Sequence, residues 1–172
     1  MQKTIRIFGY GSLINEESLR RTVPNAFNLF PAKVKGFVRV FNLPTQRKRC
    51  SEKGCPIAVL NIEKSEWNQE INGLCFEMNV EEFDALQERE RSYELIEIEI
   101  EDYEGNLHKG FTFRVLHYDA YPYIFGSSTQ DEYMQICIEG CKTFGDEFLE
   151  DFMKTTYIGN KTLEEIKEEI FA

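Results

Sequence analysis

The sequence predicts an α+β domain built on a mixed, barrel-like β-sheet with helices packed around it. Segments with strand character dominate the middle of the chain, whereas helical segments gather at its end. The regular alternation of strands and helices that builds a doubly wound sheet does not occur. A length of 172 residues is typical of one domain. We therefore expect a single domain over residues 1–172, with residues 155–172 as a C-terminal helical tail.

The composition supports a globular protein and argues against two classes of partner. Hydrophobic residues make up 42% of the chain, and 14 Phe and 8 Tyr supply bulk for a sizeable core. The net charge of −10 argues against nucleic acid and against an anionic membrane surface, since both attract basic proteins. We find no signal-peptide pattern and no apolar run of membrane-spanning length, so we expect a cytoplasmic protein.

In the first half of the chain, apolar runs rich in β-branched and aromatic residues predict mainly strands. The predicted strands cover residues 3–8, 33–41, 57–62 and 71–78. A short helix is expected over residues 16–21. Val80, Phe83 and Leu86 recur at helical spacing, which predicts a second helix over Val80–Arg89.

The second half of the chain begins with the clearest strand signal and ends in helices. Residues 95–100 (LIEIEI) alternate strictly between apolar and acidic residues, so Glu97 and Glu99 belong to an exposed face. A turn at residues 104–106 predicts a hairpin with a partner strand over residues 109–117. An aromatic loop is expected over residues 118–130, followed by helices over residues 131–144, 146–154 and 163–171.

The five cysteines give no sign of disulfides or of a metal site. Their number is odd, none lies in a CxxC pair, and the chain has only two histidines, His108 and His117. Cys137 and Cys141 lie four residues apart in a predicted helix, so they share one face. We predict reduced thiols in the core and no bound metal.

A glycine-rich turn follows the first predicted strand, at Gly9-Tyr10-Gly11-Ser12-Leu13. Glycines let a ligand approach the main chain closely, and successive N–H groups at such a bend can point at an anion. The pattern is not a dinucleotide-binding motif, because Ile14 occupies the place of the third glycine. It is not a nucleophile elbow either, because Tyr10 stands where that motif needs glycine. From the spacing alone, a ligand-binding turn and an ordinary tight turn are both open.

Four segments, in this order, resemble the γ-glutamylcyclotransferase superfamily with its ChaC-like and AIG2-like branches. They are FGYGSL at residues 8–13, GFVRVFN at residues 36–42, LQERE at residues 86–90, and residues 133–140, which are similar to a family helix with the pattern YxxxIxxGA. The resemblance implies the family's barrel-like fold and a turn at Gly9, Tyr10, Gly11, Ser12 and Leu13 that binds the γ-glutamyl part of the substrate. It also implies Glu90 as the catalytic base. Gln87 and Arg91 stand where the family often has Asp and Gly.

Glu90 also has a position that suits a base. It follows the end of a predicted helix, where the helix dipole disfavours a carboxylate by about 0.3–1 kcal/mol. A partly desolvated carboxylate at such a place is suited to general base catalysis near neutral pH. Glu88 is a rival, and the residues alone leave the choice open, as they leave open that both are surface acids beside Arg89 and Arg91. The resemblance favours Glu90, four positions after Leu86.

The implied reaction needs no cofactor and no metal. The α-amine of a γ-glutamyl group attacks its own γ-carbonyl carbon, 5-oxoproline forms, and an amine or amino acid leaves. Both reacting groups belong to one small molecule, so the enzyme has to fold the substrate and move a proton. The N–H groups of the turn would hold the glutamyl unit and the charge of the tetrahedral intermediate. Glu90 would take the proton and return one to the leaving nitrogen.

Several alternatives stay open at this point. Arg39 and the pair Arg47 and Arg49 are candidates to bind substrate carboxylates, although a solvated strand end and a polar loop are more ordinary roles for them. The aromatic segment 118–125 could line the pocket or pack in the core. The fold could also serve as a non-catalytic small-ligand-binding module, or act on γ-glutamylamines or carrier-bound acyl groups. A serine hydrolase based on Ser12 would need a histidine that no motif places.

Overall fold

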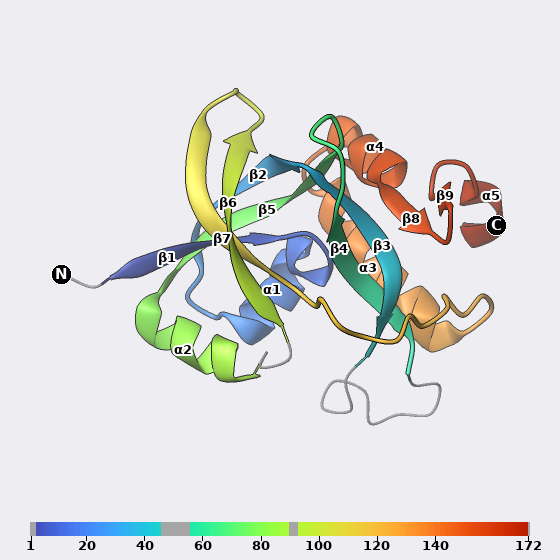
Figure 1. The fold of residues 1–172 in the computed structure, drawn as a ribbon, viewed down its shortest axis with the longest axis horizontal. Coiled ribbons are helices and arrows are strands. Elements are labelled where there is room, and N and C mark those ends of the chain that lie inside the picture. Colours follow the sequence, from blue (N-terminus) through green and yellow to red (C-terminus); the bar gives the residue numbers. More distant parts are fainter. Residues whose placement is uncertain (1–2, 46–55, 90–92, 172) are drawn as a thin grey trace.

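A closed five-stranded β-barrel forms one half of the molecule (Figure 1). The structure is a computed structural model that describes residues 3–45, 56–89 and 93–171. The barrel strands are β1 (Thr4–Gly9), β5 (Glu70–Asn79), β2 (Phe27–Lys35), β6 (Glu94–Asp102) and β7 (Leu107–Arg114), in this spatial order. A parallel pairing of Ile7 with Phe111 closes the ring between β1 and β7. The predicted α+β class with a barrel-like mixed sheet is confirmed.

A second sheet stands beside the barrel, and the chain enters it at Gly36. Its strands are β4 (Ala58–Lys64), β3 (Phe37–Pro44), β8 (Thr156–Ile158) and β9 (Lys161–Thr162), in this spatial order. The single strand predicted over residues 33–41 is therefore wrong, because it is divided between β2 and β3. Gly36 has a φ of +86°, which glycine adopts without strain, and its N–H donates to the Gln69 carbonyl at 2.7 Å. The bend at Gly36 sends the strand from the barrel into the second sheet.

The helices are grouped at the two sheets (Figure 1). A 3-10 turn, η1 (Ser12–Ile14), and the helices α1 (Glu16–Thr22) and α2 (Val80–Arg89) lie at the barrel. The helices α3 (Ser128–Lys142) and α4 (Asp146–Thr155) lie at the second sheet, and α5 (Lys167–Ile170) is a short helix near the C-terminus. The bounds of α2 agree with the predicted helix Val80–Arg89.

The C-terminal segment is mostly not helical. Only Lys167–Ile170 forms a helix, so the predicted helix over residues 163–171 and the helical tail over residues 155–172 are wrong for most of their length. Thr156 instead pairs in parallel with Arg39, and a turn at Gly159, with a φ of +62°, returns the chain into β9. β-Branched and aromatic residues at 156–158 favour a strand once an unpaired edge of β3 is available.

Two buried amide side chains make the backbone hydrogen bonds that a neighbouring strand would otherwise make. Gln130 accepts a hydrogen bond from the Ala58 N–H at 3.0 Å and donates to the Ala58 carbonyl at 2.8 Å. Asn61 donates to the Val115 carbonyl at 2.9 Å and accepts from its N–H at 3.1 Å. Each amide satisfies both backbone groups of one residue, as a neighbouring strand would. Gln130 thereby joins α3 to β4, and Asn61 joins β4 to the segment that follows β7.

The core contains the thiols that the sequence places on one helix face. Cys137 and Cys141 are fully buried, as predicted, and form no disulfide bond in the described part of the chain; Cys75 is buried in β5. Burial raises the pKa of the Cys137 thiol to about 12, so it stays protonated at neutral pH. Cys50 and Cys55 lie outside the described residues.

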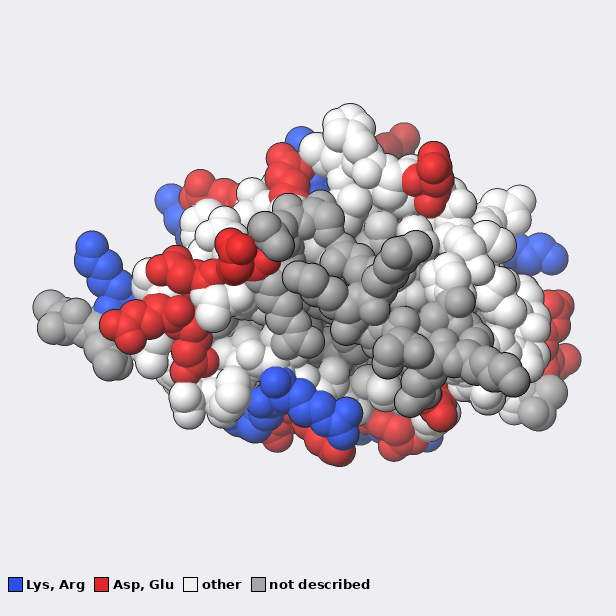
Figure 2. All heavy atoms as spheres, turned by 90° about the horizontal axis from the view of Figure 1, so that it is seen from below, with Lys and Arg blue, Asp and Glu red and all other residues white. Residues whose placement is uncertain are grey.

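The described surface carries the negative charge unevenly (Figure 2). In Figure 2, acidic side chains gather at the left end of the molecule, which is the end where α2 lies in Figure 1. Lys and Arg side chains form a smaller group along the lower edge of this view. Helix α2 itself carries four acidic residues, Glu81, Glu82, Asp84 and Glu88. Within residues 3–45, 56–89 and 93–171, no helix is long and apolar enough to cross a membrane.

Candidate active site

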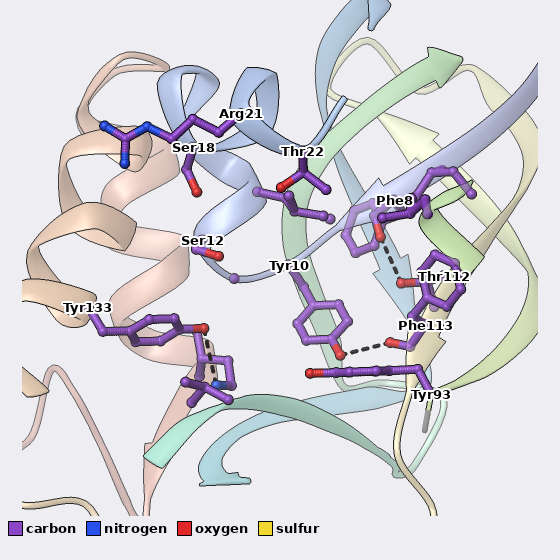
Figure 3. A pocket seen from close by; sticks show the side chains of 17 residues that line it. Phe8, Tyr10, Ser12, Ser18, Arg21, Thr22, Tyr93, Thr112, Phe113 and Tyr133 are labelled. Carbon is purple, nitrogen blue, oxygen red and sulfur yellow. Dashed lines mark hydrogen bonds between the residues drawn. The ribbon is translucent and has the colours of Figure 1, made fainter. Parts of the chain in front are cut away.

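A cavity of about 430 Å³ opens at the end of β1, beside the glycine turn (Figure 3). The predicted binding residues Gly9, Tyr10, Gly11, Ser12 and Leu13 all line it. The remaining walls come from β1, α1, β4, α2 and β7 and from two tyrosines; they are Ile7, Phe8, Ser18, Arg21, Thr22, Val59, Leu60, Leu86, Tyr93, Thr112, Phe113 and Tyr133. The cavity therefore collects segments from most of the chain around one turn.

The turn presents backbone N–H groups rather than a reactive side chain. The Gly11 carbonyl accepts from the Ile14 N–H at 3.0 Å, and the Ser12 carbonyl accepts from the Asn15 N–H at 3.1 Å, which forms η1. The first N–H groups of such a turn have no partner within it. Within residues 3–45, 56–89 and 93–171, no backbone carbonyl accepts a hydrogen bond from the N–H groups of Gly11, Ser12 and Leu13. Three donors are thus gathered at the cavity, an arrangement suited to a negatively charged oxygen.

Two tyrosines fix the walls on either side of the turn (Figure 3). Tyr10 is buried, and its hydroxyl donates to the Phe113 carbonyl at 2.7 Å, which ties the turn to the end of β7. The Tyr133 hydroxyl accepts from the Leu60 N–H at 3.3 Å and ties α3 to β4. A Cβ atom at Gly11 would lie 3.1 Å from the Tyr133 Oη, so glycine lets this tyrosine close on the turn.

Helix α3 supports the turn from behind through Gly140. A Cβ atom there would lie 2.6 Å from the Asn15 nitrogen and 2.8 Å from the Ile14 carbonyl carbon, so the two backbones are in direct contact. The Asn15 amide donates to the Ile136 carbonyl at 3.1 Å, and its oxygen accepts from the Ser18 N–H and caps α1. The segment similar to the family helix thus supplies both a cavity wall and the support of η1.

Glu90, the predicted base, lies outside the described residues. The residues that precede and follow it are informative, because Leu86 and Tyr93 both line the cavity that contains Gly11. The rival Glu88 is exposed on α2. The assignment of the base to Glu90 therefore stays a prediction.

The other candidates from the sequence lie elsewhere. Arg39 is fully buried, so its interpretation as a solvated strand end is wrong, and it does not belong to the described cavity lining either. Arg47 and Arg49 fall outside the described residues. Of the aromatic loop, Tyr123 packs against Phe41 in the core, and the segment adds nothing to the described lining.

Charged groups are scarce in the described lining. Arg21 is its one charged residue, and it pairs with Glu17 at 2.8 Å on the exposed side of α1. Neither histidine belongs to this lining. His108 lies in the β6–β7 hairpin, 3.0 Å from Asp102, and this hydrogen bond holds the pKa of Asp102 down at about 2. Ser12 therefore has no histidine beside it in the described lining, which argues against a serine hydrolase.

The described residues also offer no metal site. Within them, no group of three or more His, Cys, Asp or Glu side chains is arranged to hold a metal ion. The chemistry that this part of the cavity can supply comes from backbone donors, hydroxyl groups and one guanidinium.

Known structures share this architecture. A structure described as a γ-glutamyl cyclotransferase is 21% identical with a TM-score of 0.71, over 98% of this chain and 99% of that one. An uncharacterized protein from Homo sapiens is 22% identical with a TM-score of 0.72, over 99% and 100%. A yeast γ-glutamyl cyclotransferase described as specific to glutathione is 14% identical with a TM-score of 0.59, over 98% and 96%. At these identities the likeness establishes the fold alone.

The sequence itself assigns the family. None of the curated proteins matches it. The model of the ChaC-like protein family matches residues 5–172, which is nearly the whole chain and includes the turn, α2 and α3. The chain therefore belongs to the ChaC-like protein family.

Proposed function

We propose that this protein is a γ-glutamylcyclotransferase that converts the γ-glutamyl group of a small molecule into 5-oxoproline and releases an amine or amino acid. A bond forms between the α-nitrogen and the γ-carbonyl carbon, and the bond from that carbon to the distal nitrogen breaks. On the way to the lactam the α-ammonium loses two protons, and the amide nitrogen that leaves gains two and departs as an ammonium group, so the reaction balances without a cofactor. The observation that carries the proposal is the set of backbone donors of the Gly11–Leu13 segment at a cavity in a ChaC-like fold.

The proposed roles follow from what each group can do. The N–H groups of the turn bind the γ-glutamyl unit and stabilise the oxyanion that develops on the γ-carbonyl, which is often the largest single contribution to such catalysis. Glu90 acts as general base toward the ammonium and then as general acid toward the leaving nitrogen. Leu86 and Tyr93, which bracket Glu90 in the sequence, line the same cavity, and this supports the assignment. Ser12 serves as a binding residue.

The proposed function is tested by measuring 5-oxoproline release with liquid chromatography. The panel contains glutathione, several γ-glutamyl amino acids, γ-glutamylamines and, as matched controls, the corresponding α-glutamyl dipeptides. The γ-glutamyl compounds should yield 5-oxoproline and the distal amine in equal amounts, whereas the α-glutamyl dipeptides should yield neither. Binding of γ-glutamyl compounds without any turnover would instead establish the alternative, a non-catalytic ligand-binding module.

Arg21 is expected to favour leaving groups that carry a carboxylate. It is the one charged residue of the described lining, and it lies beside Ser18 on one face of α1 (Figure 3). Exposed ion pairs contribute about 0.2–1 kcal/mol, so Arg21→Gln should lower kcat/KM about two- to fivefold for γ-glutamyl dipeptides and leave γ-glutamylamines unchanged. Arg20→Gln is the control, because Arg20 forms the same kind of pair with Glu16 but does not line the cavity. An equal effect of Arg21→Gln on both substrate classes would contradict this role.

A further inference from the structure

A buried guanidinium stands behind the glycine turn. Arg39, in β3, has no exposed surface, and its guanidinium lies 4.1 Å from the ring centre of Phe152. It makes five hydrogen bonds: Nε to the Thr156 hydroxyl at 2.8 Å, Nη1 to the carbonyls of Tyr10 and Asn72 at 3.0 and 2.5 Å, and Nη2 to the Asn72 side-chain oxygen and the Thr155 hydroxyl at 2.8 and 2.9 Å. All of these acceptors are uncharged.

This arrangement is unusual for a residue that only fills space. Burying a charge is expensive, and an apolar side chain of similar volume commonly gives equal or better stability. Arg39 satisfies all of its five donors and joins three separate segments: the turn, β5 and the junction between α4 and β8. Burial lowers the pKa of Arg39 to about 10, so it keeps its charge at neutral pH. A fixed positive charge therefore lies next to the turn.

The bond to Tyr10 determines which way the turn's first donor points. In a trans peptide the carbonyl and the following N–H point in opposite directions across one plane. Because the Tyr10 carbonyl is bound to Arg39, the Gly11 N–H is directed away from Arg39. Gly11 lines the cavity, whereas Arg39 does not belong to the described lining. Among the described residues, no backbone carbonyl accepts a hydrogen bond from the Gly11 N–H.

We propose that Arg39 is a positioning residue, which locks the Tyr10–Gly11 peptide so that the Gly11 N–H donates to a negatively charged oxygen of the substrate. This inference rests on the proposed function. A guanidinium bound to the carbonyl also polarises the peptide, and hydrogen bonds in such chains strengthen one another by about 10–30%. The Gly11 N–H donates either to a carboxylate oxygen of the glutamyl unit or to the oxyanion of the γ-carbonyl.

The kinetic test compares two changes in one buried network. Arg39→Lys keeps a positive charge but loses the fork that reaches Tyr10. Thr156→Val removes a different acceptor of the same guanidinium and leaves the bond to Tyr10 in place. Loss of one oxyanion donor typically costs about 10²–10³ in kcat. We expect a decrease of at least about tenfold in kcat for Arg39→Lys and less than about threefold for Thr156→Val, at a temperature where both are folded. If both variants lost the same factor in kcat and the same amount in Tm, the role of Arg39 would be structural only, and the proposal would be overturned.

A second measurement, by NMR, does not depend on turnover or on whether the Arg39→Lys variant folds. The eleven glycines are labelled with ¹⁵N, and the loss of one signal in Gly11→Ala identifies the Gly11 amide. In the ligand-free wild type this amide should exchange rapidly with solvent, whereas the Gly36 amide, bound to the Gln69 carbonyl, should be protected. The Gly11 signal should shift in Arg39→Lys and stay in place in Thr156→Val; if Arg39→Lys does not fold, the wild-type exchange decides alone. A protected Gly11 amide in the ligand-free protein would overturn the proposal. A wild type that releases no 5-oxoproline would refute the proposed function but not this orientation.

Discussion

Replacing Glu90 with glutamine is expected to lower kcat for 5-oxoproline release by about 10²–10⁴-fold, the usual contribution of a general acid–base group. Glutamine has nearly the same shape as glutamate but cannot accept the proton of the substrate ammonium. Substrate binding should persist, because the backbone donors of the turn at Gly11 are unchanged. The measurement is steady-state kinetics on the best γ-glutamyl substrate, after circular dichroism has shown that the variant melts near the wild-type Tm.

Glu88→Gln is the matched control for this prediction. Glu88 is exposed on α2, two positions before Glu90, and its replacement should leave kcat within about twofold if Glu90 is the base. An inactive Glu88→Gln beside an active Glu90→Gln would move the role of base to Glu88. If both variants turn over normally, the cyclotransferase mechanism is wrong for this chain, and Ser12→Ala becomes the next variant to test.

Local patterns predicted the fold best where an element is determined by its own residues. Phe83 and Leu86 are buried on one face of α2 and Val80 is half-buried, and the bounds of this helix agree with the prediction. The predicted helical tail over residues 155–172 is wrong for the opposite reason, because strand β8 at its start depends on an edge of β3 that is more than 100 residues away. Gly36 shows a third case. A single residue with positive φ divides an uninterrupted strand pattern into two strands of different sheets.

The candidate site could be predicted from the sequence only in part, and for a similar reason. The turn at Gly9 to Leu13 is a continuous segment, so its glycines and its place after β1 made it visible. Tyr93 and Tyr133 line the same cavity, but only the closed barrel and α3 bring them there. For Arg39 the sequence leaves a carboxylate-binding role and a solvated strand end open, since an arginine on a strand is usually exposed. Its burial depends on acceptors from the turn, β5, α4 and β8, which no local pattern reveals.

Gly140→Ala is expected both to destabilise the protein and to lower its activity, against the usual effect of this substitution. Alanine in place of glycine within a helix normally adds about 1 kcal/mol of stability. Here the added methyl group would meet backbone atoms of Asn15 and Ile14 at 2.6–2.8 Å, and backbone atoms cannot rotate away. Overpacking of this kind costs about 1–3 kcal/mol, so the net free energy of unfolding should fall.

Activity should also fall, because a shift of α3 would displace the turn that it supports. Asn15 caps α1 and follows η1, so a shift of α3 moves the Ser12 and Leu13 donors relative to the other cavity walls. A displacement of about 1 Å at a catalytic site can cost about 10²-fold, and we expect kcat/KM to fall by this order. Urea unfolding and kinetics measure the two effects, with Glu132→Ala, at an exposed position of the same helix, as the control for helix propensity. A Gly140→Ala protein that is more stable and fully active would mean that α3 does not hold the turn in place.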